Sequence, residues 1–197
     1  MIETPRPRAS SASRITLRTA DAAEAKKLHA LITANLEEGR LLPRTLSELT
    51  LHADRFTIAV RGRSIVGCAE LAPLSPVVAE VRSLAVDPSV RRNGVGTHIV
   101  EELRRRARRE GFEKLCAFTH APGYFIHMGF SIVPHLWLPE KIFTDCVGCP
   151  HFRKCGQYAM VVPVTPLESE FEAERERPLA ASYGDARGRA PSAPRYA

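Results

Sequence analysis

The sequence predicts one α/β domain, in which helices pack against a β-sheet. Three observations support this fold class. From residue 14 to residue 164, runs with the apolar pattern of strands alternate with runs at helical spacing. At 197 residues, 44% of them hydrophobic, the chain can form one buried core of ~150 residues. In its middle, an extended apolar run at residues 77–86 precedes a turn and then a helical pattern.

The two ends of the chain lack the apolar pattern of a folded element. Residues 1–13 are rich in Pro, Arg, Ser and Ala, and residues 165–197 turn first to Glu and Arg and then to Ala, Gly, Pro and Ser. We therefore expect a disordered leader and a disordered tail around a domain of residues 14–164. Within that domain, residues 134–157 contain cysteines and no regular pattern, and we expect an irregular insertion there.

The first part of the domain is predicted as a strand, two capped helices and a hairpin. Residues 15–18 alternate as a strand, and capping boxes at residues 21–24 and 45–48 each open a helix. Apolar runs at residues 56–60 and 64–72 flank Arg-Gly-Arg, which indicates a hairpin.

The second part of the domain begins with the strand at residues 77–86. The following helix has its apolar face at Val95, Ile99, Val100, Leu103 and Ala107 and ends near Gly111, a typical C-cap residue. The remaining elements are a strand at 115–119, a short helix at 122–128, and strands at 130–133 and 158–164.

The turn between the central strand and the helix has the composition of an anion site. Asp87-Pro88 ends the strand, and Arg91-x-x-Gly94-x-Gly96 opens the helix. Glycines let the backbone approach a ligand, and the first helical turn presents unpaired N–H groups to an anion. We expect a pyrophosphate cradle here, with a turn that binds no ligand as the alternative. The spacing matches neither the Rossmann nor the Walker motif.

The whole stretch resembles the acetyl-CoA motif of the GNAT superfamily of N-acetyltransferases, Arg/Gln-x-x-Gly-x-Gly/Ala. A Leu-Ala-Val-Asp-Pro strand end at residues 84–88 and Gly129-Phe130 support the resemblance, which covers Arg14 to Pro163. It implies a mixed, mostly antiparallel sheet, splayed between its fourth and fifth strands. It also implies that acetyl-CoA is bound by Leu84, Ala85, Val86, Arg91, Arg92, Asn93, Gly94, Val95, Gly96 and Thr97.

Composition limits the class of partner and the compartment. The net charge of +6 suits an anionic ligand such as coenzyme A. The basic run at residues 104–109 is read as a solvated helix face, with Glu101 and Glu102 placed to pair with Arg105 and Arg106, and not as a nucleic-acid surface. No apolar run approaches the ~20 residues that cross a bilayer. The N-terminus lacks a signal-peptide core, so we expect a cytoplasmic protein with reduced cysteines.

Acetyl transfer to an amine needs a group that takes a proton and benefits from one that gives a proton. Glu80, on the central strand, and Glu70, on the strand before it, are the candidate bases, with a partly exposed strand carboxylate as the ordinary alternative. Many GNAT proteins place a tyrosine acid where this chain has Phe125. Tyr124 lies one residue earlier, a rotation of about 100° on a helix, which would direct it away from the thioester sulfur.

Three stretches are similar to the short, stand-alone N-acetylglutamate synthases: residues 38–44 (Glu-Gly-Arg-Leu-Leu-Pro-Arg), residues 119–130, and the Leu-Pro-Glu-Lys-Ile and cysteine-containing run at 138–155. This resemblance implies transfer of acetyl to the α-amine of L-glutamate or L-glutamine, the first step of arginine biosynthesis. Arg44, Arg82 and Lys141 are our candidates for binding the carboxylates of the acceptor.

The sequence leaves several alternatives open. Another amine, such as a protein N-terminus, a polyamine or an antibiotic, could be the acceptor, and the last two predict an acidic pocket instead of a cationic one. A non-catalytic acyl-CoA-binding regulatory module is a further alternative, and a homodimer is the candidate assembly. Cys146, Cys149 and Cys155 could bind zinc, although acetyl transfer does not require it, or could be redox-active or plain loop thiols.

Overall fold

The computed structural model describes residues 14–39 and 41–164, so the predicted leader and tail lie outside the described residues. The strands are β1 (Ile15–Thr19), β2 (Phe56–Arg61), β3 (Ser64–Pro73), β4 (Val78–Val86), β5 (Lys114–Thr119), β6 (Ser131–Val133) and β7 (Tyr158–Pro163). The helices are α1 (Ala25–Ala34), α2 (Leu36–Gly39), α3 (Leu46–Leu51), α4 (Val95–Arg109), α5 (Pro122–His127) and α6 (Pro139–Lys141).

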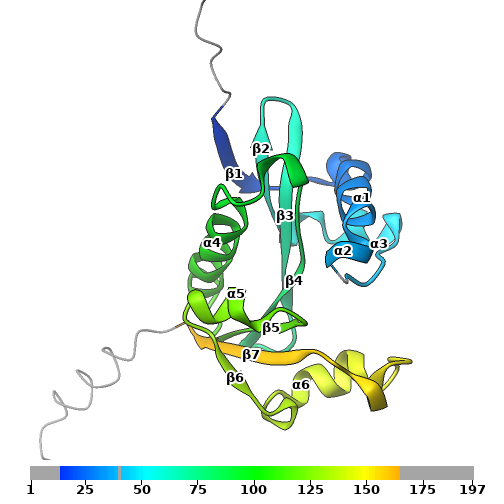
Figure 1. Ribbon diagram of the computed structural model, residues 1–197, viewed down its shortest axis with the longest axis vertical. Helices are drawn as coiled ribbons and strands as arrows, with labels where there is room; N and C mark the ends of the chain where they lie inside the picture. Colours follow the sequence, from blue (N-terminus) through cyan, green and yellow to red (C-terminus); the bar gives the residue numbers. More distant parts are fainter. Residues whose placement is uncertain (1–13, 40, 165–197) are drawn as a thin grey trace, which may run out of the picture. The chain divides into compact units, whose positions relative to one another are not determined.

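The strands form one sheet in the order β1-β2-β3-β4-β5-β7-β6, and in Figure 1 β5, β7 and β6 lie below β1 to β4. All neighbouring pairs are antiparallel except β4 and β5, which run parallel. The predicted α/β class and the mixed, mostly antiparallel sheet are therefore confirmed.

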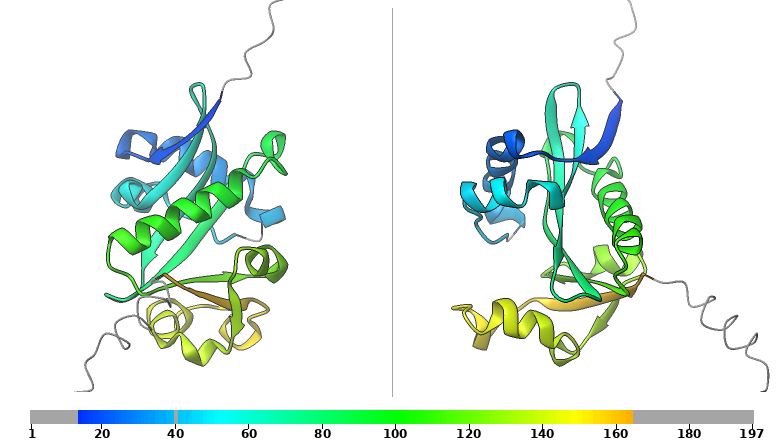
Figure 2. Two further views of the ribbon diagram at one scale, coloured as in Figure 1. Left: turned by 90° about the vertical axis from the view of Figure 1, so that its left-hand side faces the viewer. Right: turned by 180° about the vertical axis from the view of Figure 1, so that it is seen from behind.

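Helices cover both faces of the sheet. α4 lies on one face and α1 to α3 lie on the other, as Figure 1 and the view from behind in Figure 2 show. The predicted apolar face of α4 is buried in the main core, and the buried side of α1 joins Leu49 and Phe56 in a second core. The Thr45 side chain accepts a hydrogen bond from the Glu48 backbone at 3.2 Å, which confirms that cap.

The sheet opens between β4 and β5. These strands pair only at Val78–Glu80 with Lys114–Cys116, although both continue further. Beyond this junction β4 contains a bulge, because Ser83 and Leu84 together lie opposite the single residue Ala69 of β3. Ser83 has φ of 54°, which bends the strand. The predicted splay is thus confirmed, and it follows from a bend in β4.

Residues 134–157 contain more regular structure than the sequence indicates. Four short helical turns follow one another at 135–137, 139–141, 142–146 and 152–154, of which Ile142–Cys146 (η5) is a π turn. Leu138 is fully buried and fixes the segment beneath β5 and β7. The part after α6 extends to the side of the sheet where α1 to α3 lie (Figures 1 and 2).

The basic face of α4 has ion pairs that differ from those expected. Glu102 pairs with Arg105 and Arg109, and Arg106 pairs with Glu110 at 2.6 Å. The expected pairs at a spacing of four from Glu101 and Glu102 do not form among the described residues. The observed pairs are three, four and seven residues apart along the helix. As the sequence predicted, the charges on this solvent-facing side of α4 are therefore partly compensated.

Candidate active site

The turn before α4 has the backbone of an anion cradle. The Asp87 side chain accepts a hydrogen bond from the Ser89 backbone at 2.8 Å and so stabilises the turn after β4. Arg92 and Gly94 both have left-handed backbones, with φ of 65° and 75°, and α4 begins directly after Gly94. The first N–H groups of this 15-residue helix therefore face the turn, where the helix dipole is positive.

The two arginines of the cradle have different environments. Arg91 donates to the Val86 carbonyl at 3.0 Å and to the Asn35 side chain at 2.6 Å, so it ties the turn to β4 and to the end of α1. Arg92 is exposed. Arg91 thus positions the turn. Arg92, whose side chain is exposed to solvent, is better placed to bind a phosphate group at the cradle.

The Tyr124 side chain points toward the cradle, against the first turn of α4. A Cβ atom placed on Gly96 would lie 3.0 Å from the Tyr124 hydroxyl and 3.6 Å from Val86. Phe125 instead faces the core, where its ring meets Phe130 edge-on at 5.1 Å between centroids. The shift by one residue therefore exchanges the two side chains: Tyr124 faces the cradle and Phe125 is buried.

The Tyr124 hydroxyl is buried but makes no well-aligned hydrogen bond within the described residues. Burial raises its pKa, and the nearby Thr97 hydroxyl partly opposes the rise. The phenol is therefore protonated at neutral pH and available to donate a proton or a hydrogen bond.

The carboxylate of Glu80 lies at the opening of the sheet in a cluster of charges. Lys141 donates to both oxygens of Glu80, at 2.9 and 2.8 Å, and Arg82 donates to one of them at 2.6 and 3.0 Å. Asp145 completes the cluster by accepting from Arg82 at 2.5 Å and from Lys141 at 2.7 Å. The Lys141 ammonium also lies 5.2 Å from the centre of the Phe118 ring.

A second buried pair lies beside this cluster. Glu70 is 1% exposed and accepts a hydrogen bond from Arg44 at 2.8 Å. Arg44 also donates to the Ser83 hydroxyl at 3.1 Å and lies 2.9 Å from Glu48. The loop before α3 is thereby fixed to the bulge of β4.

The three cations proposed to bind the acceptor all have partners within the protein. The structure does bring Arg44, Arg82 and Lys141 to the opening of the sheet. It also pairs each of them with a carboxylate: Glu70, Glu80 or Asp145. Burying a cation without a partner is costly, so these cations take internal partners.

The charge on Asp145 has a consequence for stability against pH. Burial alone would raise the pKa of Asp145, but the hydrogen bond from Lys141 and the charge of Arg82 hold it below its usual range. Because the folded pKa is depressed, these pairs contribute stability above about pH 4 and lose it as the pH falls through the lowered pKa. The difference in melting temperature between wild type and Asp145→Asn should therefore shrink from pH 7 to pH 3. A difference independent of pH would contradict this.

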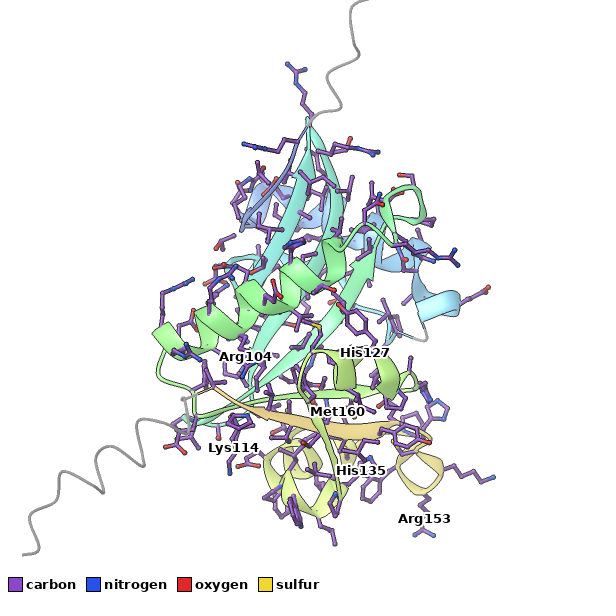
Figure 3. The ribbon with its side chains drawn as sticks, turned by 60° about the vertical axis from the view of Figure 1, so that its left-hand side comes forward. Arg104, Lys114, His127, His135, Arg153 and Met160 are labelled. Atoms are coloured by element: carbon purple, nitrogen blue, oxygen red, sulfur yellow. The ribbon has the colours of Figure 1, made fainter. Side chains whose placement is uncertain are left out.

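Two polar residues at the end of β5, Thr119 and His120, make local contacts and do not join the charge cluster. Thr119 accepts a hydrogen bond from the Ala121 backbone at 3.0 Å and so caps the turn after β5. His120 packs against Gly156. A hollow between α4 and α5 is lined by Thr97, Val100, Glu101, Arg104, His127, Met128 and Phe130. Figure 3 labels Arg104 and His127 in this region.

The three cysteines of residues 134–157 lie on the surface side of the insertion. Cys146 and Cys149 are half-buried and Cys155 is exposed, and burial raises the pKa of the Cys146 thiol. Among residues 14–39 and 41–164, no group of three His, Cys, Asp or Glu side chains is close enough to hold a metal ion. In the same part of the chain, no helix is both long and apolar enough to cross a membrane.

Sequence reasoning missed two residues that shape the site. Asp145 closes the charge cluster, and its spacing of four from Lys141 on a helix was a usable signal. Asn35 fixes Arg91 from 56 residues away, and no local pattern reveals such a contact.

The comparisons with known proteins agree with this geometry. The profile of the acetyltransferase (GNAT) family matches residues 23–130. An uncharacterized N-acetyltransferase of Chlorobaculum tepidum is 30% identical over 145 residues, which cover 74% of this chain and 94% of that protein. The chain belongs to the GNAT acetyltransferase family, and it is an acetyltransferase with the fold described above.

An amino-acid acetyltransferase and an N-acetylglutamate synthase are two further relatives. The amino-acid acetyltransferase of Pectobacterium carotovorum is 31% identical over 107 residues, 53% of this chain and 24% of that protein. The N-acetylglutamate synthase of Neisseria gonorrhoeae, solved with coenzyme A and N-acetyl-glutamate, is 25% identical with a TM-score of 0.69. That match covers 78% of this chain and 36% of that one. This chain thus spans about a quarter to a third of the length of these relatives.

Proposed function

We propose that this protein transfers an acetyl group from acetyl-CoA to the α-amine of L-glutamate or L-glutamine, the first step of arginine biosynthesis. The observation that carries the proposal is the group of Arg44, Arg82 and Lys141 at the opening of the sheet, beside the cradle that would hold the diphosphate of acetyl-CoA. Similarity to amino-acid acetyltransferases supports the same acceptor.

In this proposal, the cradle from Arg91 to Thr97 binds the acetyl-CoA diphosphate through backbone N–H groups. The pantetheine arm enters the opening beyond Glu80, and the backbone of residues 84–86 polarises the thioester carbonyl. Glu80 takes the proton of the ammonium through a water molecule, because Arg82 and Lys141 occupy both of its oxygens. Glu70, which is also buried and is paired with Arg44, is the alternative base.

Tyr124 is our candidate acid for the departing thiolate. Replacing it by phenylalanine keeps the ring against Gly96 and removes only the hydroxyl. A thiolate is a fair leaving group with an ordinary pKa near 8.5, so we expect a loss in kcat of about tenfold, at the low end of acid catalysis. Steady-state rates against pH will check this. An unchanged kcat across the profile would leave Tyr124 with a packing role.

The proposal is tested by measuring coenzyme A release from acetyl-CoA with the purified full chain. Glutamate, glutamine, aspartate, a basic peptide and spermidine are compared as acceptors. Turnover confined to glutamate or glutamine supports the amino-acid assignment. Acetyl-CoA binding without turnover on any acceptor would favour the non-catalytic module.

A second candidate function, acetylation of a cationic amine, is favoured by the charge count at the opening. The three cations face four carboxylates, Glu48, Glu70, Glu80 and Asp145, so the region is slightly acidic as a whole. Turnover with spermidine or the basic peptide alone would support this function and end the arginine-pathway assignment.

A further inference from the structure

The four charges around Glu80 differ in how easily each could move. Glu80 lies on the central strand with 4% of its side chain exposed, and Lys141 has 11% exposed. Arg82 and Asp145 lie on the outer side of the cluster, with 27% and 33% exposed. Asp145 also belongs to a single π turn, whereas Glu80 and Arg82 belong to the sheet.

Asp145 makes the contacts that a carboxylate of an acceptor would make. One of its oxygens accepts from both Arg82 and Lys141, at 2.5 and 2.7 Å, so one carboxylate bridges two cations. Such bridging by charge-assisted hydrogen bonds is how arginine and lysine recognise carboxylates. Within the cluster the two cations are already matched by two carboxylates.

An arriving carboxylate cannot simply be added to this arrangement. It would place a third negative charge on two cations, and like charges at a few ångströms repel. One of the resident carboxylates must then leave. Glu80 would have to leave a buried position on the sheet, which is expensive, whereas Asp145 needs only to turn its side chain toward solvent.

We propose that, in the free protein, Asp145 occupies the position that a carboxylate of the acceptor takes on Arg82 and Lys141, and that competition with Asp145 sets how tightly acidic acceptors bind. The inference rests on the proposed function, since it assumes an acceptor that carries a carboxylate. Asp145 is in this sense a specificity-determining residue, which stabilises two cations until the acceptor replaces it.

The test compares wild type, Asp145→Asn and a control, Glu140→Gln, as full-length proteins. The control removes the same charge from the same segment, and Glu140 has no contact with Arg82 or Lys141 among the ion pairs described. For Asp145→Asn we expect the KM for glutamate to fall about three- to tenfold with kcat within about twofold, the effect of removing one competing charge-assisted contact. The KM for spermidine should not fall in any variant.

A comparison of acceptors and a binding measurement make the outcome decisive. A lower KM for both glutamate and glutamine supports competition for the shared α-carboxylate, and a lower KM for glutamate alone supports competition for its side chain. Calorimetric titration of glutamate into the protein saturated with coenzyme A should show the same gain in affinity without any turnover. Melting curves and the acetyl-CoA affinity establish that Asp145→Asn is folded.

Failure of this inference differs from failure of the proposed function. If wild type acetylates glutamate and the KM of folded Asp145→Asn is unchanged or higher, Asp145 only orients the cations and the inference is overturned. If neither protein binds or acetylates glutamate or glutamine while a cationic amine is used, the proposed function itself has failed. As a last check, the double variant Arg82→Gln/Asp145→Asn should lose the lower KM for glutamate that Asp145→Asn alone shows.

Discussion

Replacing Arg44 by methionine is expected to lower the free energy of unfolding by about 3 to 5 kcal/mol, the cost of removing one partner from a buried ion pair. Glu70 is 1% exposed, and Arg44 is its hydrogen-bonding partner within the described residues. The change would leave its carboxylate in the core, where a charge without a partner is strongly disfavoured. The melting temperature should fall by roughly 6 to 20 °C.

Two matched variants separate the ion pair from the loss of a long side chain. Arg18→Met removes an arginine whose side chain is 48% exposed from its ion pair with Glu24 at 2.7 Å, and should cost under about 1 kcal/mol because solvent screens the arginine. The double variant Arg44→Met/Glu70→Leu replaces both charges by apolar groups and should recover most of the loss. If the double variant is no more stable than Arg44→Met, the uncompensated charge of Glu70 is not the cause.

Gly96→Val is expected to lower kcat/KM for acetyl-CoA about a hundredfold, the size of effect seen when reacting groups are misplaced by about 1 Å. A Cβ atom at this position lies 3.0 Å from the Tyr124 hydroxyl, and the valine methyl groups extend further into the same space. Tyr124 must then move away from the first turn of α4, where the proposal places the diphosphate of acetyl-CoA, and so lose its position along the bound cofactor.

Gly123→Ala is the control for this prediction. Gly123 lies in α5 one residue before Tyr124, and a Cβ atom there meets nothing within 4 Å. Its kcat/KM should stay close to that of wild type, and its helix should be slightly more stable because alanine favours helices. Equal rates for Gly96→Val and Gly123→Ala would show that the approach of Tyr124 to α4 is not needed for activity.

Much of the fold could be predicted because its signals are local. Capping boxes, the Arg-Gly-Arg turn and the apolar face of α4 each depend on residues that are close in the sequence, and the structure has the corresponding elements. The mixed, mostly antiparallel sheet and its splay came from resemblance to a family, and the order of the strands was not predicted. The helical turns of residues 134–157 were missed because three- to five-residue turns carry too little periodicity.

The residues that line the site could be named from the sequence, but the contacts between them could not. The turn at Gly94 and Gly96 follows from the backbone demands of those glycines. The pairing of Arg44 with Glu70 and of Lys141 with Glu80 joins residues 26 and 61 positions apart, and a single sequence contains no sign of such partners. The contact of Tyr124 with the first turn of α4 was not foreseen, because it depends on how α5 packs on the sheet.

The short junction of β4 with β5 bears on the mechanical behaviour of the domain. Among the described residues, only three residue pairs of β4 and β5 join the group β1 to β4 to the group β5, β7 and β6 within the sheet. The angle between the two groups of strands is therefore weakly constrained by backbone hydrogen bonds. A molecule that hydrogen-bonds to the unpaired edges of both β4 and β5 would hold the two groups of strands at a fixed angle. Acetyl-CoA would then stabilise the arrangement of the strands as well as react, and the domain would be most rigid with acetyl-CoA bound.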